Sequence, residues 1–166
     1  MTDVTIHSRA DGHLPGCIEA LASVHAADRY PVHWPADPGG WLTPRNMLAA
    51  WVAVDGPEVL GHVVLARPGE ALASVVGLPA RRLVSVARLF VSAAARRRGT
   101  AAKLLERAVD EAAAHGLRPV LEVEAGATAA IKLYERAGWR CIGTSAADWT
   151  AADGRIAQVR SYVGPS

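Results

Sequence analysis

A strand-like segment that runs into small and basic residues carries the clearest chemical signal in this sequence. Leu83–Val91 is apolar and β-branched and predicts a strand, whereas residues 99–115 have the spacing of a long helix that ends at Gly116. The first amides of a helix have no partner within it, and together with the helix dipole they attract anions. We therefore expect an anion site at the start of this helix.

The residue types at this junction suit a phosphate group. Gly99 lets a phosphate approach the backbone closely. Ala101, further along the helix, has a side chain small enough to allow a similar close approach. Arg96, Arg97 and Arg98 add positive charge at the same place. The segment fits neither the GxxxxGK[ST] pattern nor the GxGxxG pattern of nucleotide-binding loops. A solvated, basic start of a helix is the alternative interpretation.

A second segment, residues 127–137, predicts a helix that begins shortly after a strand at residues 118–123. Helical spacing puts several residues on one face of it: Ala130, Leu133 or Tyr134, and Ala137. From this periodicity alone, Tyr134 is a half-buried core residue whose hydroxyl needs a partner.

Both segments resemble signatures of the GNAT superfamily of N-acetyltransferases. Residues 96–101 match its [Q/R]xxGx[G/A] pattern, and residues 127–139 are similar to its AIxLYEKxGF-type helix, with Trp139 where Phe is usual. The resemblance spans roughly residues 51–163. It implies an α/β fold with a central, mostly antiparallel sheet and helices on both faces.

In that family the loop amides hold the pyrophosphate of acetyl-CoA, and the preceding strand pairs its backbone with the pantetheine arm. The resemblance therefore implies that acetyl-CoA is bound by Leu89, Phe90, Val91, Arg96, Arg97, Arg98, Gly99, Thr100, Ala101, Ala127, Ala130 and Tyr134. The family often has Asn at the position of Ala127, so one side-chain hydrogen bond to the cofactor is missing here.

The resemblance also implies a reaction: an acetyl group moves from acetyl-CoA to a primary amine by direct attack in a ternary complex. The backbone N–H near Val91 would polarise the thioester carbonyl. Tyr134 would be the general acid that gives a proton to the departing CoA thiolate, because a thiolate leaving group benefits from a nearby O–H donor.

The amine is protonated at neutral pH, so some group must remove a proton before attack. Strand alternation places Glu122 and Glu124 on one face, where one carboxylate can raise the pKa of the other toward that of a base. A solvated or ion-paired strand end is the alternative. His62 faces the acceptor groove or is simply packed in its apolar strand, and His33 is a further candidate. We take Glu124 and His62 as the candidate bases.

Residues 30–44 are rich in Pro and Gly and predict an ordered loop. Loops on a rigid scaffold often carry function, and in GNAT proteins the first two helices and their connection wall the acceptor site. The resemblance thus implies that the acceptor is bound by Tyr30, His33, Trp34, Asp37 and Trp41. The aromatic rings would form an apolar wall, with Asp37 ready for a cationic amine. Alternatively, the two Trp side chains anchor the loop to the core.

These residues must be positioned by elements that hydrophobic spacing and turn residues predict. We expect strands at residues 2–7, 51–54, 60–66, 83–91, 118–123, 139–145 and 156–163, and helices at residues 14–27, 44–50, 99–115 and 127–137. Residues 67–82 read as irregular. Helices interrupt a run of strands instead of alternating with each one, which favours a mixed sheet over a doubly wound parallel sheet.

Composition excludes several other classes of protein. With 166 residues, 51% hydrophobic and 20% charged, the chain predicts one domain over residues 1–166. No apolar run approaches the ~18 residues of a membrane span, and no leader is visible at the N-terminus. Cys17 and Cys141 lack metal-site spacing, so we expect no metal and a cytoplasmic location.

The net charge of +2 is too balanced for nucleic acid to be the main partner, although a basic module built on Arg96, Arg97 and Arg98 is a weak alternative. The expected partner is a small-molecule or peptide amine, with no membrane. A homodimer is compatible with the family, many of whose members dimerise. The second functional hypothesis is a non-catalytic acyl-CoA-binding sensor on the same fold.

Overall fold

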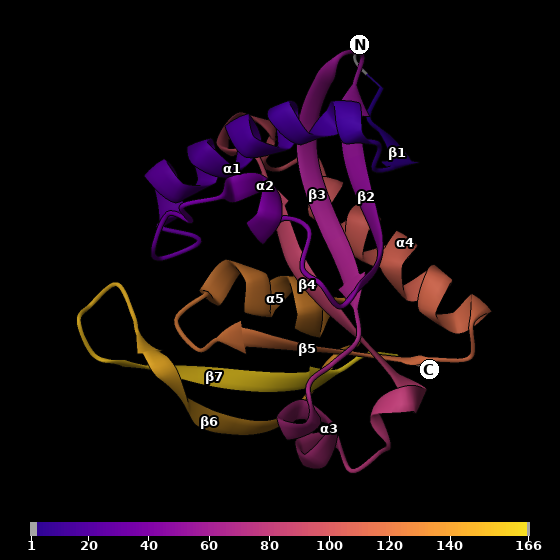
Figure 1. Ribbon diagram of the computed structural model, residues 1–166, viewed down its shortest axis with the longest axis vertical. Helices are drawn as coiled ribbons and strands as arrows, with labels where there is room; N and C mark the ends of the chain where they lie inside the picture. The colour runs from indigo at the N-terminus through magenta and orange to yellow at the C-terminus, as the bar shows by residue number, and fades with distance from the viewer. Residues whose placement is uncertain (1–2, 166) are drawn as a thin grey trace. The chain divides into compact units, whose positions relative to one another are not determined.

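The computed structural model describes residues 3–165, and Figure 1 shows its strands and helices. The strands are β1 (Thr5–Ser8), β2 (Met47–Asp55), β3 (Glu58–Ala66), β4 (Leu83–Val91), β5 (Arg118–Glu124), β6 (Arg140–Thr150) and β7 (Ile156–Val163). The helices are α1 (Leu14–Asp28), α2 (Pro38–Trp41), α3 (Glu70–Val76), α4 (Thr100–Ala114) and α5 (Thr128–Arg136).

Within the described residues the strands form one seven-stranded sheet with the order β1-β2-β3-β4-β5-β7-β6. The pairs β1–β2, β2–β3, β5–β7 and β6–β7 are antiparallel, whereas β4 and β5 are parallel. The expected fold class, a mixed and mostly antiparallel sheet with helices, is confirmed.

The chain divides into two compact units, one formed by Met1–Ala66 and Arg88–Ala108, the other by Arg67–Ala87 and Val109–Ser166. Strand β4 and helix α4 each contribute residues to both units. The units are described one at a time below.

In the first unit, α1 covers one face of the β2–β3 hairpin. Cys17, Leu21 and Val24 recur at helical spacing, and their buried side chains pack with Val52 and Phe90. This burial of an apolar stripe, more than local helix propensity, holds α1 in place.

Helix α4 covers the opposite face of that hairpin. Trp51 precedes Val52 in β2 and therefore points the other way, and the guanidinium of Arg107 lies 5.0 Å from its ring centroid. A Cβ on Gly61 would come within 2.9 Å of both Leu104 Cδ1 and the Phe90 carbonyl oxygen. Glycine at this position thus allows α4 and β4 to approach β3 closely.

In the second unit, α3 and α5 pack on opposite faces of the β5–β7 pair. Val120 and its partner Val163 share a core with residues of α3. The next pair in the register, Leu121 and Tyr162, points to the other face, where the ring centroid of Tyr162 lies 6.2 Å from that of Tyr134 on α5. The expectation of helices on both faces is met in each unit.

The expected helix at residues 44–50 is wrong. Strand β2 begins at Met47, which pairs with Ala66 at the open end of the β2–β3 hairpin, so pairing with the next strand decides the conformation of a segment whose local preference is weak. The short helix lies earlier, at α2, because Asp37 caps its N-terminus and Pro38 suits its first turn.

Residues 67–82, expected to be irregular, contain α3, which ends at Gly77 in the left-handed region (φ 81°). The other predicted elements are confirmed with shifts at their ends, and β6 runs to Thr150 instead of residue 145. The first strand starts at Thr5, and Thr2, where we expected it to begin, lies outside the described residues.

Candidate functional site

The turn between β4 and α4 has a defined backbone. The Ser92 amide donates to the Leu60 carbonyl at 2.7 Å, which holds the start of the turn against β3. Arg97 (φ 66°) and Gly99 (φ 72°) both adopt the left-handed region, and the Lys103 amide donates to the Gly99 carbonyl at 3.1 Å. Gly99 therefore occupies the position just before the first turn of α4.

The amides that follow this turn are available to a ligand. The amides of Thr100, Ala101 and Ala102, the first residues of α4, have no i−4 partner within the helix. Thr100 is 2% exposed, and its Oγ1 has no hydrogen-bond partner. Free amides at a helix start, combined with left-handed residues, form a concave anion site.

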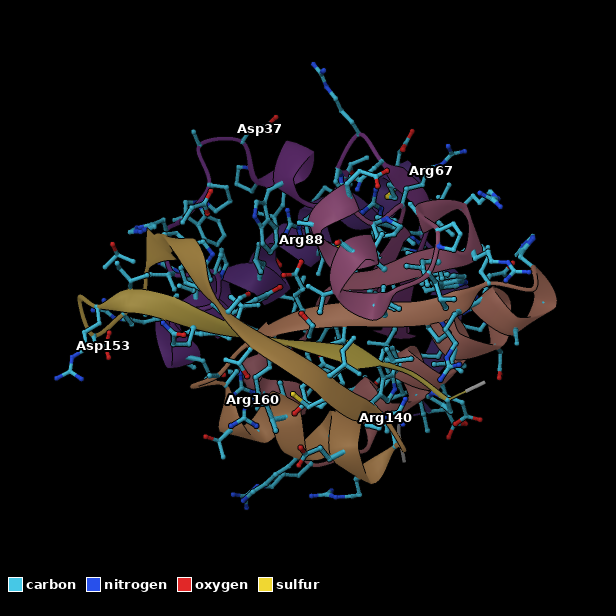
Figure 2. The ribbon with its side chains drawn as sticks, turned by 90° about the horizontal axis from the view of Figure 1, so that it is seen from below. Asp37, Arg67, Arg88, Arg140, Asp153 and Arg160 are labelled. Atoms are coloured by element: carbon cyan, nitrogen blue, oxygen red, sulfur yellow. The ribbon has the colours of Figure 1, made fainter. Side chains whose placement is uncertain are left out.

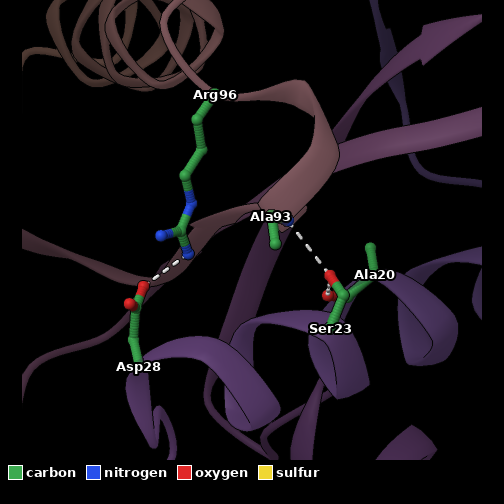
Figure 3. A network of polar contacts seen from close by, with 5 residues as sticks. All are labelled: Ala20, Ser23, Asp28, Ala93 and Arg96. Atoms are coloured by element: carbon green, nitrogen blue, oxygen red, sulfur yellow. Dashed lines mark hydrogen bonds and ion pairs between the residues drawn. The ribbon is translucent and has the colours of Figure 1, made fainter.

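Two contacts tie this loop to α1, as Figure 3 shows. The Ala93 amide donates to Ser23 Oγ at 3.1 Å, and the guanidinium of Arg96 forms an ion pair with the carboxylate of Asp28. Arg97 and Arg98 are exposed. The three arginines therefore differ, because Arg96 holds the loop while its two neighbours face solvent.

His62 is fully buried between two arginines. Its Nδ1 lies 3.0 Å from the Arg88 carbonyl oxygen, and its Nε2 lies 2.9 Å from Arg9 NH1. The carbonyl can only accept and the guanidinium can only donate, so the ring is neutral with its proton on Nδ1. Burial, together with the charges of Arg9 and Arg88, lowers the pKa of His62 to about 4. With both nitrogens in use, His62 is not suited to remove a proton from an acceptor.

The predicted acceptor loop is ordered by aromatic contacts within the first unit. The ring of Tyr30 meets that of Trp41 edge-on, with centroids 5.9 Å apart, and Trp34 lies 5.4 Å from the ring of His25 while remaining 40% exposed. His33 is exposed. Tyr30 and Trp41 also pack against the α1 core, so the anchoring alternative holds for Trp41 and not for the exposed Trp34.

Asp37 has a local role in this loop. Its carboxylate accepts a hydrogen bond from the Gly40 amide at 3.1 Å and caps α2. Figure 2 shows Asp37 at the outer edge of the view, on the loop. The structure thus gives this carboxylate a capping function and brings no cation to it.

The second unit holds the remaining predicted residues. Tyr134 is 7% exposed on α5, with its ring centroid 6.0 Å from that of Trp139. Glu124 is half-buried at the end of β5, where its carbonyl accepts from the Ala127 amide at 3.0 Å, whereas Glu122 is exposed. Ala127 is the N-cap of α5 and provides no side-chain cap; Ala130, half-buried, lies in the first turns of the same helix.

A family model described as "Acetyltransferase (GNAT) family" matches residues 18–139, which is well over half of the chain. The chain belongs to the GNAT acetyltransferase family. No curated protein sequence matches it significantly.

Solved structures with the same fold are distant in sequence. The ribosomal-protein-S18-alanine N-acetyltransferase of Escherichia coli is 20% identical, with 98% of this chain and 94% of that chain covered and a TM-score of 0.75. An N-acetyltransferase from Staphylococcus aureus Mu50 has a TM-score of 0.76 at 20% identity, with 97% of each chain covered. NAA60 of Arabidopsis thaliana, in complex with a bisubstrate analogue, has a TM-score of 0.72 at 23% identity over 96% of this chain and 98% of that chain.

In this GNAT protein, the loop before α4 fits a pyrophosphate on structural grounds. It combines free amides with a glycine whose Cβ position is open, and with the buried, unpartnered Oγ1 of Thr100. No group of three or more metal-ligating side chains occurs among the described residues, and no helix within residues 3–165 is long and apolar enough to cross a membrane.

Sequence reasoning about this GNAT protein missed Arg88. Its backbone is left-handed (φ 53°) within β4, its Nε donates to the Trp41 carbonyl at 3.1 Å, and its guanidinium lies 3.9 Å from the centroid of the Trp41 ring. The available signal was a charged residue in the middle of an otherwise apolar strand. Such a residue is expensive to bury and therefore calls for a partner.

Proposed function

We propose that this protein is an N-acetyltransferase that moves an acetyl group from acetyl-CoA to a primary amine, working as a single domain over residues 1–166. The observation that carries the proposal is the start of α4, where the amides of residues 100–102 have no partner within the helix and Thr100 Oγ1 is buried without a partner, in a chain that belongs to the GNAT family. The structure of NAA60 from Arabidopsis thaliana in complex with acetyl-CoA supports the choice of donor.

The donor would be held by two stretches of the first unit. Residues 96–101 would bind the pyrophosphate through backbone amides, with Arg97 and Arg98 adding charge. The pairing of β4 with β5 covers Leu83, Val84 and Ser85. Residues 89–91 lie outside this pairing, which supports a role of their backbone in binding the pantetheine arm. Ala127 and Ala130 stay predicted cofactor contacts.

The chemistry is a direct displacement. The amine nitrogen bonds to the thioester carbonyl carbon, and the C–S bond then breaks to release CoA. The Val91 amide would stabilise the developing oxyanion, Tyr134 would give its proton to the thiolate, and Glu124, directly or through water, would take the proton of the amine. His62 is not included because both of its ring nitrogens are engaged.

The acceptor is a small-molecule or peptide amine bound in part by the loop with Tyr30, Trp34 and Trp41.

The Cys17 and Cys141 thiols are both free, in agreement with a reducing compartment such as the cytoplasm.

A thiol-release screen with acetyl-CoA across amine classes tests the proposal. Tyr134→Phe is expected to lower kcat about 100-fold or more while leaving the acetyl-CoA-induced rise in Tm intact. Tyr162→Phe is a matched control, since it removes a buried phenol that donates to Glu135 and has no part in the reaction. Full activity of Tyr134→Phe would disprove the role of this residue, and the absence of any acetyl-CoA-induced rise in Tm would disprove the donor.

One observation favours a second candidate, an acyl-CoA-binding protein without turnover. The N-cap of α5 is Ala127, which offers no side chain to a cofactor. Tight CoA binding by calorimetry without thiol release from any amine would support this second candidate.

A further inference from the structure

Arg88 presents a fixed and unpaired cation in the first unit. The stacking on Trp41 and the bond from Nε to the Trp41 carbonyl set the plane of its guanidinium. Among the described residues, no Asp or Glu forms an ion pair with it, and its NH1 and NH2 groups have no hydrogen-bond acceptor. Four N–H donors are therefore available on the side of the guanidinium away from Nε.

The surroundings of Arg88 supply no negative charge. Burial lowers the pKa of the Arg88 guanidinium, and burial also raises the pKa of Tyr30, so its phenol stays neutral beside that guanidinium. A second arginine, Arg9, lies on the other side of His62. His62 contacts the Arg9 guanidinium through Nε2 and the main-chain carbonyl of Arg88 through Nδ1, so it links the side chain of Arg9 to the backbone of Arg88.

Arg9 differs from Arg88 because the protein uses it fully. Its NH1 donates to the Leu42 carbonyl at 2.7 Å and to His62, and its NH2 donates to Thr43 Oγ1 at 2.7 Å. These bonds make Arg9 a structural cation. Of these two arginines, Arg88 keeps the paired donors that a guanidinium offers to an oxyanion.

The position of Arg88 links it to the predicted acceptor loop. It stacks on Trp41, whose ring in turn meets Tyr30, and both aromatics belong to that loop. Figure 2 shows Arg88 toward the middle of the view and Asp37 at its outer edge. Arg88 of β4 therefore offers a cation beside this loop, whereas the loop's own carboxylate, Asp37, caps α2.

We propose that the acceptor amine also carries a carboxylate, as a free amino acid does, and that NH1 and NH2 of Arg88 bind this carboxylate. The inference rests on the proposed function and narrows its substrate class. It replaces the expectation that Asp37 binds a cationic amine. A planar guanidinium and a carboxylate form two parallel hydrogen bonds, which would fix the orientation of the acceptor.

The test compares each of several L-amino acids with its own carboxamide in the thiol-release assay. The carboxamide has the less basic amine, which by itself favours the carboxamide, so a preference for the acid points to recognition of the charge. The wild-type protein is expected to have a kcat/KM about 10- to 100-fold higher for the acids. Arg88→Gln is expected to remove this preference by raising the KM for the acids. Arg88→Lys is expected to restore part of the preference.

Arg29→Gln is the matched control, because it removes the same charge from the same left-handed backbone region (φ 57°) on an exposed residue. It is expected to keep the preference. An unchanged acetyl-CoA-induced rise in Tm shows that Arg88→Gln still folds and binds the donor. Equal activity on acids and carboxamides, or an intact preference in Arg88→Gln, would overturn the proposal.

A binding measurement separates this inference from the proposed function. With CoA present, amino acids are expected to raise the Tm of the wild-type protein more than their carboxamides do, and Arg88→Gln is expected to lose the difference. If no amine is acetylated but this difference is found, the proposed function fails and Arg88 still binds a carboxylate. If the acids raise Tm no more than the carboxamides, the carboxylate site is wrong whether or not turnover occurs.

Discussion

The guanidinium of Arg96 contacts the carboxylate of Asp28, which joins the loop before α4 to the last residue of α1 (Figure 3). Both side chains remain partly exposed, at 39% and 49%. The contact gives the first arginine of the triplet a structural role in the loop, and we propose phosphate binding for its two neighbours.

Loss of this ion pair should have a small, salt-dependent effect. Arg96→Gln is expected to lower the free energy of unfolding by up to about 1 kcal/mol, because exposed ion pairs contribute little. A double-mutant cycle with Asp28→Asn measures the coupling, which should shrink as salt is raised. Arg98→Gln is the comparison. It should change the free energy of unfolding by no more than about 0.5 kcal/mol and weaken CoA binding roughly 10-fold. A larger loss of stability in Arg98→Gln than in Arg96→Gln would contradict this division of roles.

The unpartnered hydroxyl of Thr100 predicts opposite effects on the free and the bound protein. Thr100→Val is expected to raise the free energy of unfolding by about 1 kcal/mol, because it removes a buried polar group without a partner. It should also reduce the CoA-induced rise in Tm if CoA supplies that partner. Thr43→Val, which removes an acceptor used by Arg9, should instead destabilise the protein. Calorimetry with and without CoA measures both effects. A lower free energy of unfolding for Thr100→Val in the absence of CoA would refute the expected stabilisation.

His62 makes stability depend on pH. Its pKa falls from 6.5 to about 4 on folding, so the folded state binds fewer protons between these values and is destabilised as pH decreases. Keeping His62 neutral in the folded state contributes roughly 3 kcal/mol to the free energy of unfolding. This contribution is fully present above pH 6.5 and is lost as the pH falls toward 4. His62→Gln keeps one acceptor for Arg9 and one donor for the Arg88 carbonyl without a titrating ring. Denaturant unfolding across this range should show a flatter dependence of stability on pH for His62→Gln than for the wild-type protein.

The missing cap of α5 predicts a stabilising substitution. Ala127→Asn is expected to raise the free energy of unfolding by about 1 kcal/mol, because Asn at this position accepts a bond from an amide of the first turn. Lys132→Asn, in the exposed middle of the same helix, should lower it by roughly 0.5 kcal/mol. If both substitutions destabilise the protein, Ala127 is not acting as a simple N-cap.

The long helices and the strand β4 could be predicted because each buries a face whose spacing is visible in the sequence. Helices α2 and α3 were less visible, since short elements depend on capping residues such as Asp37 and Gly77 more than on a repeated pattern. Residues 47–50 read as a helix from local sequence because their partners, residues 64–66, lie at the open end of the β2–β3 hairpin, far from the turn.

In the candidate site, the loop at residues 96–101 was predictable because residue type and local order together indicate an anion site. The bonds of His62 were not. They reach Arg9, 53 residues away, and Arg88, 26 residues away, and no local pattern encodes such long-range partners. The left-handed backbone of Arg88 carries no signal either, because its sequence context is that of a regular strand.

That backbone conformation has an evolutionary consequence. An L-residue other than glycine costs about 1–2 kcal/mol in the left-handed region, and a sequence optimised for stability alone would have glycine or asparagine at position 88. If Arg88 binds an acceptor carboxylate as we propose, arginine there is a trade-off in which stability is given up for a directed charge. Family members that acetylate uncharged amines would be free of that demand, so the residue at this position becomes a marker by which acid-accepting relatives could be recognised from sequence.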